Sequence, residues 1–102
     1  MYRQIRMNKW RPGVTEEEVD SVVAALREMA AGIPLLLNVE CIKDNDADDD
    51  NWDFLLITDF ASREDHQRYM VDPNHKDLVA DRVRPILEST ARIQYEIGDG
   101  AA

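Results

Sequence analysis

The chain has 102 residues and a formal net charge of −9, from 21 Asp and Glu against 12 Lys and Arg, which predicts one domain with a single core. Nucleic-acid backbones and anionic membrane surfaces attract cationic proteins, so this acidic balance argues against both as partners. The longest apolar runs are too short to span a bilayer and the sequence begins directly with strand-like residues, so we expect a cytoplasmic protein.

The first half of the chain predicts a strand, a helix and a second strand. Residues 2–10 alternate polar and bulky side chains, as a strand does. Thr15 and Glu18 match the capping box that begins a helix. The core face of that helix is an apolar stripe at three- and four-residue spacing, formed by Val19, Val22, Val23, Leu26, Met29 and Ala30. Pro34 ends the helix, and residues 35–42 predict the next strand.

The second half predicts a third strand, two helices and a last strand. Residues 53–60 are mostly apolar on both faces of a strand, so both faces should be covered. A serine-capped helix over residues 63–71 is followed by another helix from 75 to about 87. Residues 91–97 predict the last strand, and residues 98–102 a flexible C-terminal tail.

The element order β-α-β-β-α-β predicts a ferredoxin-like α+β domain over residues 1–97, with a four-stranded antiparallel sheet and helices on one face. Those helices leave the second apolar face of the sheet without a cover. Too little chain remains to form one, so we expect the sheet of a second subunit to pack there. A subunit this small that also holds a pocket gains stability by self-association, so the predicted assembly is a homo-oligomer.

A tyrosine and a histidine flank a proline turn in the segment Tyr69-Met70-Val71-Asp72-Pro73-Asn74-His75. A phenol and an imidazole both donate and accept hydrogen bonds, so the pair could bind or protonate a small molecule. With Thr15-Glu16-Glu17-Glu18, Ile33-Pro34 and Asp59-Phe60, this Tyr-x-x-(His or Asp)-Pro-x-His pattern resembles the Dabb (stress-responsive A/B barrel) family. The resemblance covers nearly the whole chain and implies a dimeric α/β barrel, in which two sheets pack face to face.

One plant branch of that family suggests a mechanism. Olivetolic acid cyclase, a polyketide cyclase without a cofactor, has a tyrosine and a histidine at the places matched by Tyr69 and His75. The resemblance implies that His75 is a general base for a proton between two carbonyls and that Tyr69 donates to the resulting enolate. It implies no cofactor. The same substrate is not expected, because Gln4 and Phe54 replace histidines of the cyclase and Leu26 replaces a tyrosine.

The resemblance also implies a ligand pocket on the helix side of the first strand. The ligand-binding residues that it predicts are Gln4, Arg6, Asn8, Trp10 and Phe54. Such a polar and cationic lining would suit an oxygen-rich or anionic ligand. Plain alternation argues for the opposite orientation of the strand, because Ile5 and Met7 would be its natural core residues. The sequence leaves both orientations open.

Two main classes of function follow. The first is a small-molecule-binding dimer with cofactor-independent acid/base chemistry, acting as a cyclase, isomerase or lyase on an oxygenated organic substrate. The second is a non-catalytic stress-related structural or ligand-binding dimer, in which Tyr69 and His75 lock the turn at Pro73. A third class, the monooxygenases among related ferredoxin-like dimers, is not favoured by any feature of the sequence.

The other reactive residue types favour structural roles. His66 has polar and charged neighbours, so we expect it at the surface. Cys41 is expected to be a buried, inert thiol. Two histidines and one cysteine do not form the usual transition-metal constellation, so no metal site is predicted. Residues 43–51 resemble the opening of a calcium loop but lack its glycine and its final glutamate, which favours a solvated acidic loop.

Overall fold

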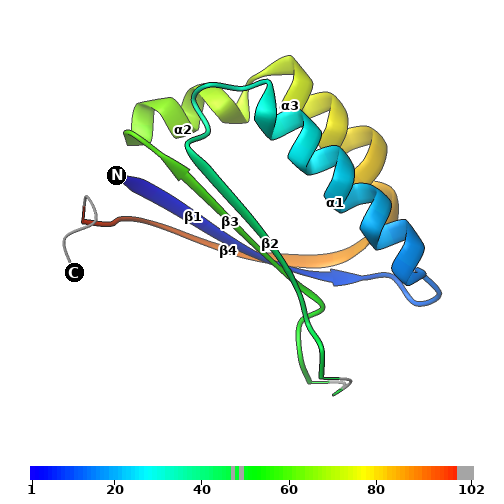
Figure 1. The fold of residues 1–102 in the computed structure, drawn as a ribbon. Coiled ribbons are helices and arrows are strands. Elements are labelled where there is room, and N and C mark those ends of the chain that lie inside the picture. Colours follow the sequence, from blue (N-terminus) through cyan, green and yellow to red (C-terminus); the bar gives the residue numbers. More distant parts are fainter. Residues whose placement is uncertain (47, 49, 99–102) are drawn as a thin grey trace.

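An antiparallel sheet forms one layer of the protein (Figure 1). The computed structural model describes residues 1–46, 48 and 50–98. The strands of this part of the chain are β1 (Tyr2–Trp10), β2 (Asn38–Lys43), β3 (Phe54–Phe60) and β4 (Leu87–Glu96). They are ordered β2-β3-β1-β4, with antiparallel pairing throughout. This topology confirms the predicted ferredoxin-like α+β fold.

The helices cover one face of the sheet, where α1 lies alongside the segment that begins with α3 (Figure 1). They are α1 (Glu16–Ala31), α2 (Arg63–Met70) and α3 (Pro73–Leu78), and α3 continues into a π-helical turn, η1 (Val79–Val83), and a 3-10 turn, η2 (Arg84–Ile86). The capping box at the start of α1 is present: the Glu18 backbone N–H donates to the Thr15 hydroxyl, and the Thr15 N–H donates to the Glu18 carboxylate.

Two strands have boundaries that differ from the sequence-based prediction. β2 begins at Asn38 rather than at residue 35, because the Leu36 N–H donates to the Ile33 carbonyl and keeps the preceding residues in a turn. β4 begins earlier than residue 91, since its pairing with β1 extends to Leu87 opposite Trp10. Most of the predicted tail, residues 99–102, lies outside the described residues.

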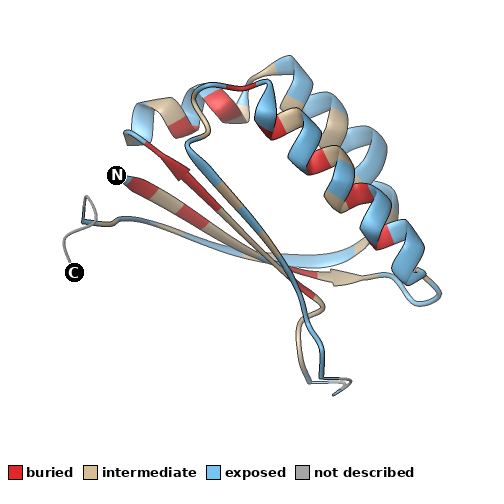
Figure 2. Ribbon diagram, in the orientation of Figure 1, coloured by how far each residue is buried: buried red, intermediate tan, exposed pale blue. Residues whose placement is uncertain are grey.

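The core lies between the sheet and the helices (Figure 2). One cluster of buried apolar residues consists of Val22, Leu26 and Phe54, and a second consists of Ile33, Phe60 and Tyr69. Both clusters join residues of β3 to helical or adjoining segments, so they hold the helices onto the sheet. None of the helices in the described part of the chain is long and apolar enough to cross a membrane.

The other face of the sheet carries exposed apolar side chains and an ion pair between Arg3 and the buried carboxylate of Asp59. The exposed apolar residues on this face include Met7, Ile42, Ile93 and Tyr95. Asp59 is 1% exposed and accepts hydrogen bonds from Arg3 Nε at 2.7 Å, Arg3 Nη2 at 2.9 Å and Asn38 Nδ2 at 3.1 Å. The hydrogen bond from Arg3 holds the pKa of this carboxyl below its usual value.

Candidate functional site

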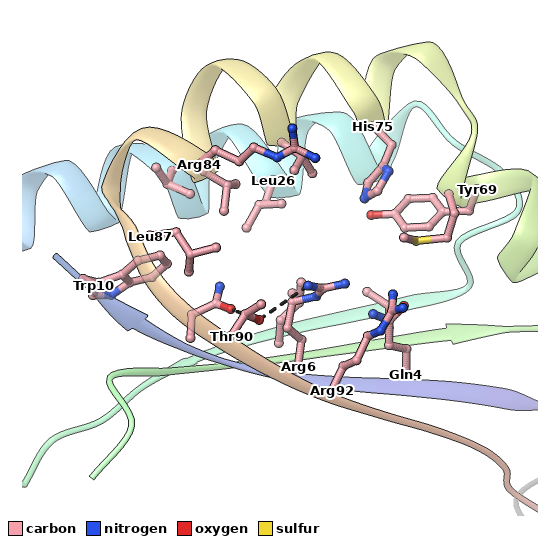
Figure 3. A pocket seen from close by; sticks show the side chains of 17 residues that line it. Gln4, Arg6, Trp10, Leu26, Tyr69, His75, Arg84, Leu87, Thr90 and Arg92 are labelled. Carbon is pink, nitrogen blue, oxygen red and sulfur yellow. Dashed lines mark hydrogen bonds between the residues drawn. The ribbon is translucent and has the colours of Figure 1, made fainter. Parts of the chain in front are cut away.

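A pocket of about 360 Å³ lies between the sheet and the helices (Figure 3). Its volume falls within the range of small-molecule sites, about 300–1,000 Å³. Side chains from the strands β1, β3 and β4 form one wall, and side chains from the helical elements α1, α2, α3, η1 and η2 form the other. The pocket therefore lies within the layer where a completely filled core would otherwise form.

The first strand turns its polar residues toward this pocket. The residues of β1 in the pocket lining are Gln4, Arg6, Asn8 and Trp10. Ile5 and Met7 point to the opposite face of the sheet, where Met7 is 37% exposed. The orientation inferred from plain alternation is therefore wrong. Phe54 lies outside the pocket lining and packs instead with Val22 and Leu26 beneath α1.

Tyr69 and His75 meet in the pocket, where both side chains point inward (Figure 3). Their ring centroids are 4.2 Å apart. The turn between α2 and α3 produces this arrangement, because Asp72 caps α3 by accepting from the Asn74 N–H at 2.9 Å, and Pro73 occupies the first turn. Tyr69 is 3% exposed.

Burial favours the neutral forms of both rings. It raises the pKa of Tyr69, so the phenol keeps its proton and remains a donor at neutral pH. It lowers the pKa of His75 below the ordinary 6.5, so the imidazole is neutral and one ring nitrogen can accept a proton. The backbone of Met70 opposes this shift of the His75 pKa. The buried Nδ1 of His75 has no hydrogen-bond partner among the residues that the structure describes.

His66 is not at the surface, contrary to the sequence-based prediction. It is 4% exposed, and its ring packs edge-on against Phe60 with a centroid separation of 5.2 Å. Its Nε2 lies 2.5 Å from Oε1 of Gln4, which is itself 4% exposed. With Nε2–H as the donor, this contact fixes the Gln4 amide and turns its NH₂ group away from the histidine. The charged residues next to His66 in the sequence suggested exposure. They could not indicate this contact, because the partner, Gln4, lies 62 positions away.

Three arginines also belong to the pocket lining: Arg6 on β1, Arg92 on β4 and Arg84 at the start of η2. Arg6 and Arg92 are direct cross-strand partners, so their side chains leave the same face of the sheet. Arg6 Nη1 donates to Thr90 Oγ1 at 3.4 Å, and Thr90 Oγ1 donates to Asn8 Oδ1 at 2.7 Å.

Sequence reasoning did not identify Arg84, Thr90 or Arg92 as pocket residues. Arg84 follows η1, and the π-helical turn brings Val79 and Val83 into the lining just before it. Thr90 and Arg92 enter the pocket through the register of β4 on β1. That register could be predicted only if the start of β4 were known, and the predicted strand began at residue 91. π-Helical turns of this kind occur frequently at functional sites.

The other reactive groups stand apart from the pocket. Cys41 is a free, half-buried cysteine, and burial raises the pKa of its thiol, which favours the unreactive form. No group of three or more His, Cys, Asp and Glu side chains that could hold a metal ion occurs among residues 1–46, 48 and 50–98. Ala47 and Asp49 of the predicted acidic loop lie outside the described residues.

Comparison with known proteins places the chain in a structural context. Residues 3–97 match the Stress responsive A/B Barrel Domain family, Dabb. No curated protein matches the sequence. A dimeric ferredoxin-like protein of unknown function from Thermobifida fusca is 27% identical, with a TM-score of 0.84 over 94% of this chain and 90% of its own.

Two further solved structures share the fold at lower identity. A Dabb family protein from Mesorhizobium loti is 20% identical, with a TM-score of 0.79 over 95% of this chain and 97% of its own. The hydroxynitrile lyase from Passiflora edulis is 17% identical, with a TM-score of 0.83 over 96% of this chain and 94% of its own. At these identities the similarity extends to the fold alone.

Proposed function

The chain belongs to the Dabb family, and we propose that its pocket binds a small oxygenated organic molecule and performs acid/base chemistry on it without a cofactor. The observation that carries the proposal is the convergence of the Tyr69 and His75 side chains, whose ring centroids are 4.2 Å apart, in a pocket of about 360 Å³. A hydroxynitrile lyase shares this fold, which supports the idea that the fold can accommodate an enzyme site.

In the proposed mechanism, His75 is the general base and Tyr69 is the donor. A ring nitrogen of His75 takes the proton from a carbon between two carbonyls, and the C–H electron pair moves into the enolate. The Tyr69 hydroxyl donates a hydrogen bond to the enolate oxygen, where negative charge develops. In an isomerisation, the protonated His75 then returns the proton to a different carbon of the conjugated enolate system. In a cyclisation, the enolate carbon instead attacks a second carbonyl of the ligand, and the oxygen of that carbonyl takes up the proton from His75. Gln4, Arg6 and Asn8 orient the ligand.

Exchange of the acidic C–H of benzoylacetone in deuterium oxide, followed by NMR, tests the first step. We expect the protein to accelerate the exchange and the His75→Ala variant to lose about 100-fold or more of that acceleration, the usual range for a general base. The elution volume in size-exclusion chromatography and the circular dichroism of the variant serve as controls for assembly and fold. Exchange at the same rate with the variant would remove His75 from the mechanism.

We also propose that the chain forms a homodimer through the open face of its sheet. The residues that support this interface are Met7, Ile42, Ile93 and Tyr95, which are large apolar side chains left exposed on that face. Burying them against a second sheet would stabilise the assembly through the hydrophobic effect. Proteins with this fold from Thermobifida fusca and Bacteroides fragilis are described as dimeric.

The alternative is a non-catalytic dimer in which the two rings only stabilise the turn at Pro73. One observation favours it: Tyr69 also belongs to the core, with its ring centroid 5.1 Å from that of Phe60. On this view the His75→Ala variant should have a lower Tm and no ligand effect. The proposed enzyme instead requires loss of exchange activity in a variant that remains folded.

A further inference from the structure

We propose that the natural ligand of the pocket is an organic carboxylate, with its anionic group held between Arg6 and Arg92 and its apolar body directed toward Trp10. This inference rests on the proposed function, because it names the substrate class of the same pocket. It depends on three properties of the lining: its charge, the polarity of its hydrogen-bonding groups and its shape.

The charge of the lining is opposite to the charge of the protein. The chain carries 21 Asp and Glu residues, yet the pocket lining includes no carboxylate and includes Arg6, Arg84 and Arg92. None of these arginines forms an ion pair with a described residue. A cationic pocket in an acidic protein selects for anions, because the rest of the surface repels them.

The arrangement of Arg6 and Arg92 is unfavourable without an anion. They are direct cross-strand partners, and like charges in that position destabilise a sheet. Arg6 is half-buried, and burial together with the charge of Arg92 lowers the pKa of its guanidinium. A carboxylate bound between the two side chains would replace this repulsion with charge-assisted hydrogen bonds, for which the planar guanidinium is well suited.

Three neutral polar side chains of the lining, those of Gln4, Asn8 and Tyr69, present hydrogen-bond donors. In the tautomer with the proton on Nε2, His66 donates to Gln4 Oε1, and the amide of Gln4 then offers its NH₂ group to the pocket. Asn8 Oδ1 is likewise occupied by the Thr90 hydroxyl, which leaves its NH₂ group as the donor. Tyr69 keeps its proton because burial raises its pKa. A lining of donors complements a ligand rich in acceptors, such as a carboxylate next to carbonyl oxygens.

The shape of the pocket orients such a ligand. The head groups of Arg6 and Arg92 lie on the sheet side below Tyr69 and His75, and Trp10, Leu26 and Leu87 lie toward the other end (Figure 3). A carboxylate on the arginines would therefore place the adjoining carbons beneath the His75 ring. The apolar remainder of the ligand would extend toward the indole of Trp10.

A matched pair of ligands tests the inference. Benzoylpyruvate has a carboxylate, an acidic carbon between two ketones and an aromatic ring, and benzoylpyruvamide differs from it only by the neutral amide in place of the carboxylate. Calorimetric titration should give a Kd about tenfold to hundredfold lower for benzoylpyruvate, the range expected of a charge-assisted hydrogen bond. The Arg92→Gln and Arg6→Gln variants should each lose about tenfold of that preference.

The Arg68→Gln variant is the control, because Arg68 lies on α2, outside the pocket lining, and its side chain is 72% exposed. It makes the same change of net charge and should keep the wild-type preference. Since Arg92 is exposed, its variant should fold even if the Arg6 variant does not. Equal Kd values for the two ligands, absence of benzoylpyruvate binding up to millimolar concentration, or an equal loss in the Arg68 variant would each overturn the inference.

The same titrations keep this inference separate from the proposed function. If the amide binds as tightly as the carboxylate and benzoylacetone exchange still depends on His75, the proposed ligand class is wrong, and the proposed acid/base role of His75 is retained. If benzoylpyruvate is preferred but exchange does not depend on His75, the protein is a carboxylate-binding dimer without the proposed chemistry.

Discussion

Acid should destabilise this protein through its two histidines, and His66 permits a quantitative test. Burial lowers the pKa of His66 below the ordinary 6.5, and the nearby charges of Arg92, Arg6 and Arg63 lower it further. The unfolded chain therefore binds more protons than the folded chain just below pH 6.5. Stability from this group is fully present above that pH and is lost as the pH falls.

The size of the loss follows from the linkage relation. Between a pH of about 7.5 and a pH of about 5.5, the lowered pKa of one histidine reduces the free energy of unfolding by at most about 1.4 kcal/mol, the full amount applying when the folded-state ring stays neutral throughout. The pKa of His75 is lowered as well, so the two histidines together should reduce the free energy of unfolding by up to about 2.7 kcal/mol over this pH interval. The pKa of Asp59 is lowered from an ordinary value of 3.8, so that carboxyl does not titrate in this window.

Urea unfolding at these two pH values measures the loss, and the His66→Gln variant isolates the contribution of one ring. Glutamine can donate to Gln4 Oε1 but does not titrate, so the variant should lose only about half as much stability as the wild type. Protein concentration must be the same throughout, because dissociation of a dimer contributes to apparent stability. An equal loss in the variant and the wild type, or greater wild-type stability at the lower pH, would show that protonation of His66 does not cause the loss.

Three further substitutions test other parts of the structure. Tyr69→Phe should reduce the acceleration of benzoylacetone exchange by about 100-fold with little change in Tm, because the ring still packs while the hydroxyl donor is lost; unchanged exchange would exclude the donor role. Asp59→Asn should lower the free energy of unfolding in urea by about 2–3 kcal/mol, because the buried side chain loses the negative charge that accepts hydrogen bonds from Arg3 and Asn38; a change below about 0.5 kcal/mol would contradict this. Ile93→Asp should raise the dimer Kd at least about tenfold in sedimentation equilibrium, and an unchanged Kd would place the interface elsewhere.

The fold was predictable because its local signals agree with one another. The Thr15 capping box, the apolar stripe of α1 and the alternation of β3 each indicate their element, and their order gives the ferredoxin-like topology. Strand ends were less predictable, since hydrogen bonds between segments distant in sequence determine them. β4 thus begins at Leu87 because it pairs with the far end of β1.

The candidate site was harder to predict because it does not follow the usual rules of burial. Gln4 and Asn8 are buried while Met7 is exposed, the reverse of what alternation predicts for a strand over a filled core. The reversal makes sense only with a pocket on one side of the sheet and an uncovered apolar face on the other. His66 was wrongly predicted to lie at the surface for a related reason. Its burial depends on contacts with Gln4 on β1 and Phe60 on β3, which the residues beside it on α2 do not indicate.

NMR of the histidine rings shows whether a ligand binds beside His75. The chain has only two histidines, so the His66→Gln variant leaves His75 as the one histidine ring of the protein. On titration with benzoylpyruvate we predict a saturable change in the chemical shift of that ring, with the same Kd as in calorimetry. A His75 signal that stays unchanged while calorimetry detects binding would show that the ligand binds elsewhere on the protein and not in the pocket beside His75.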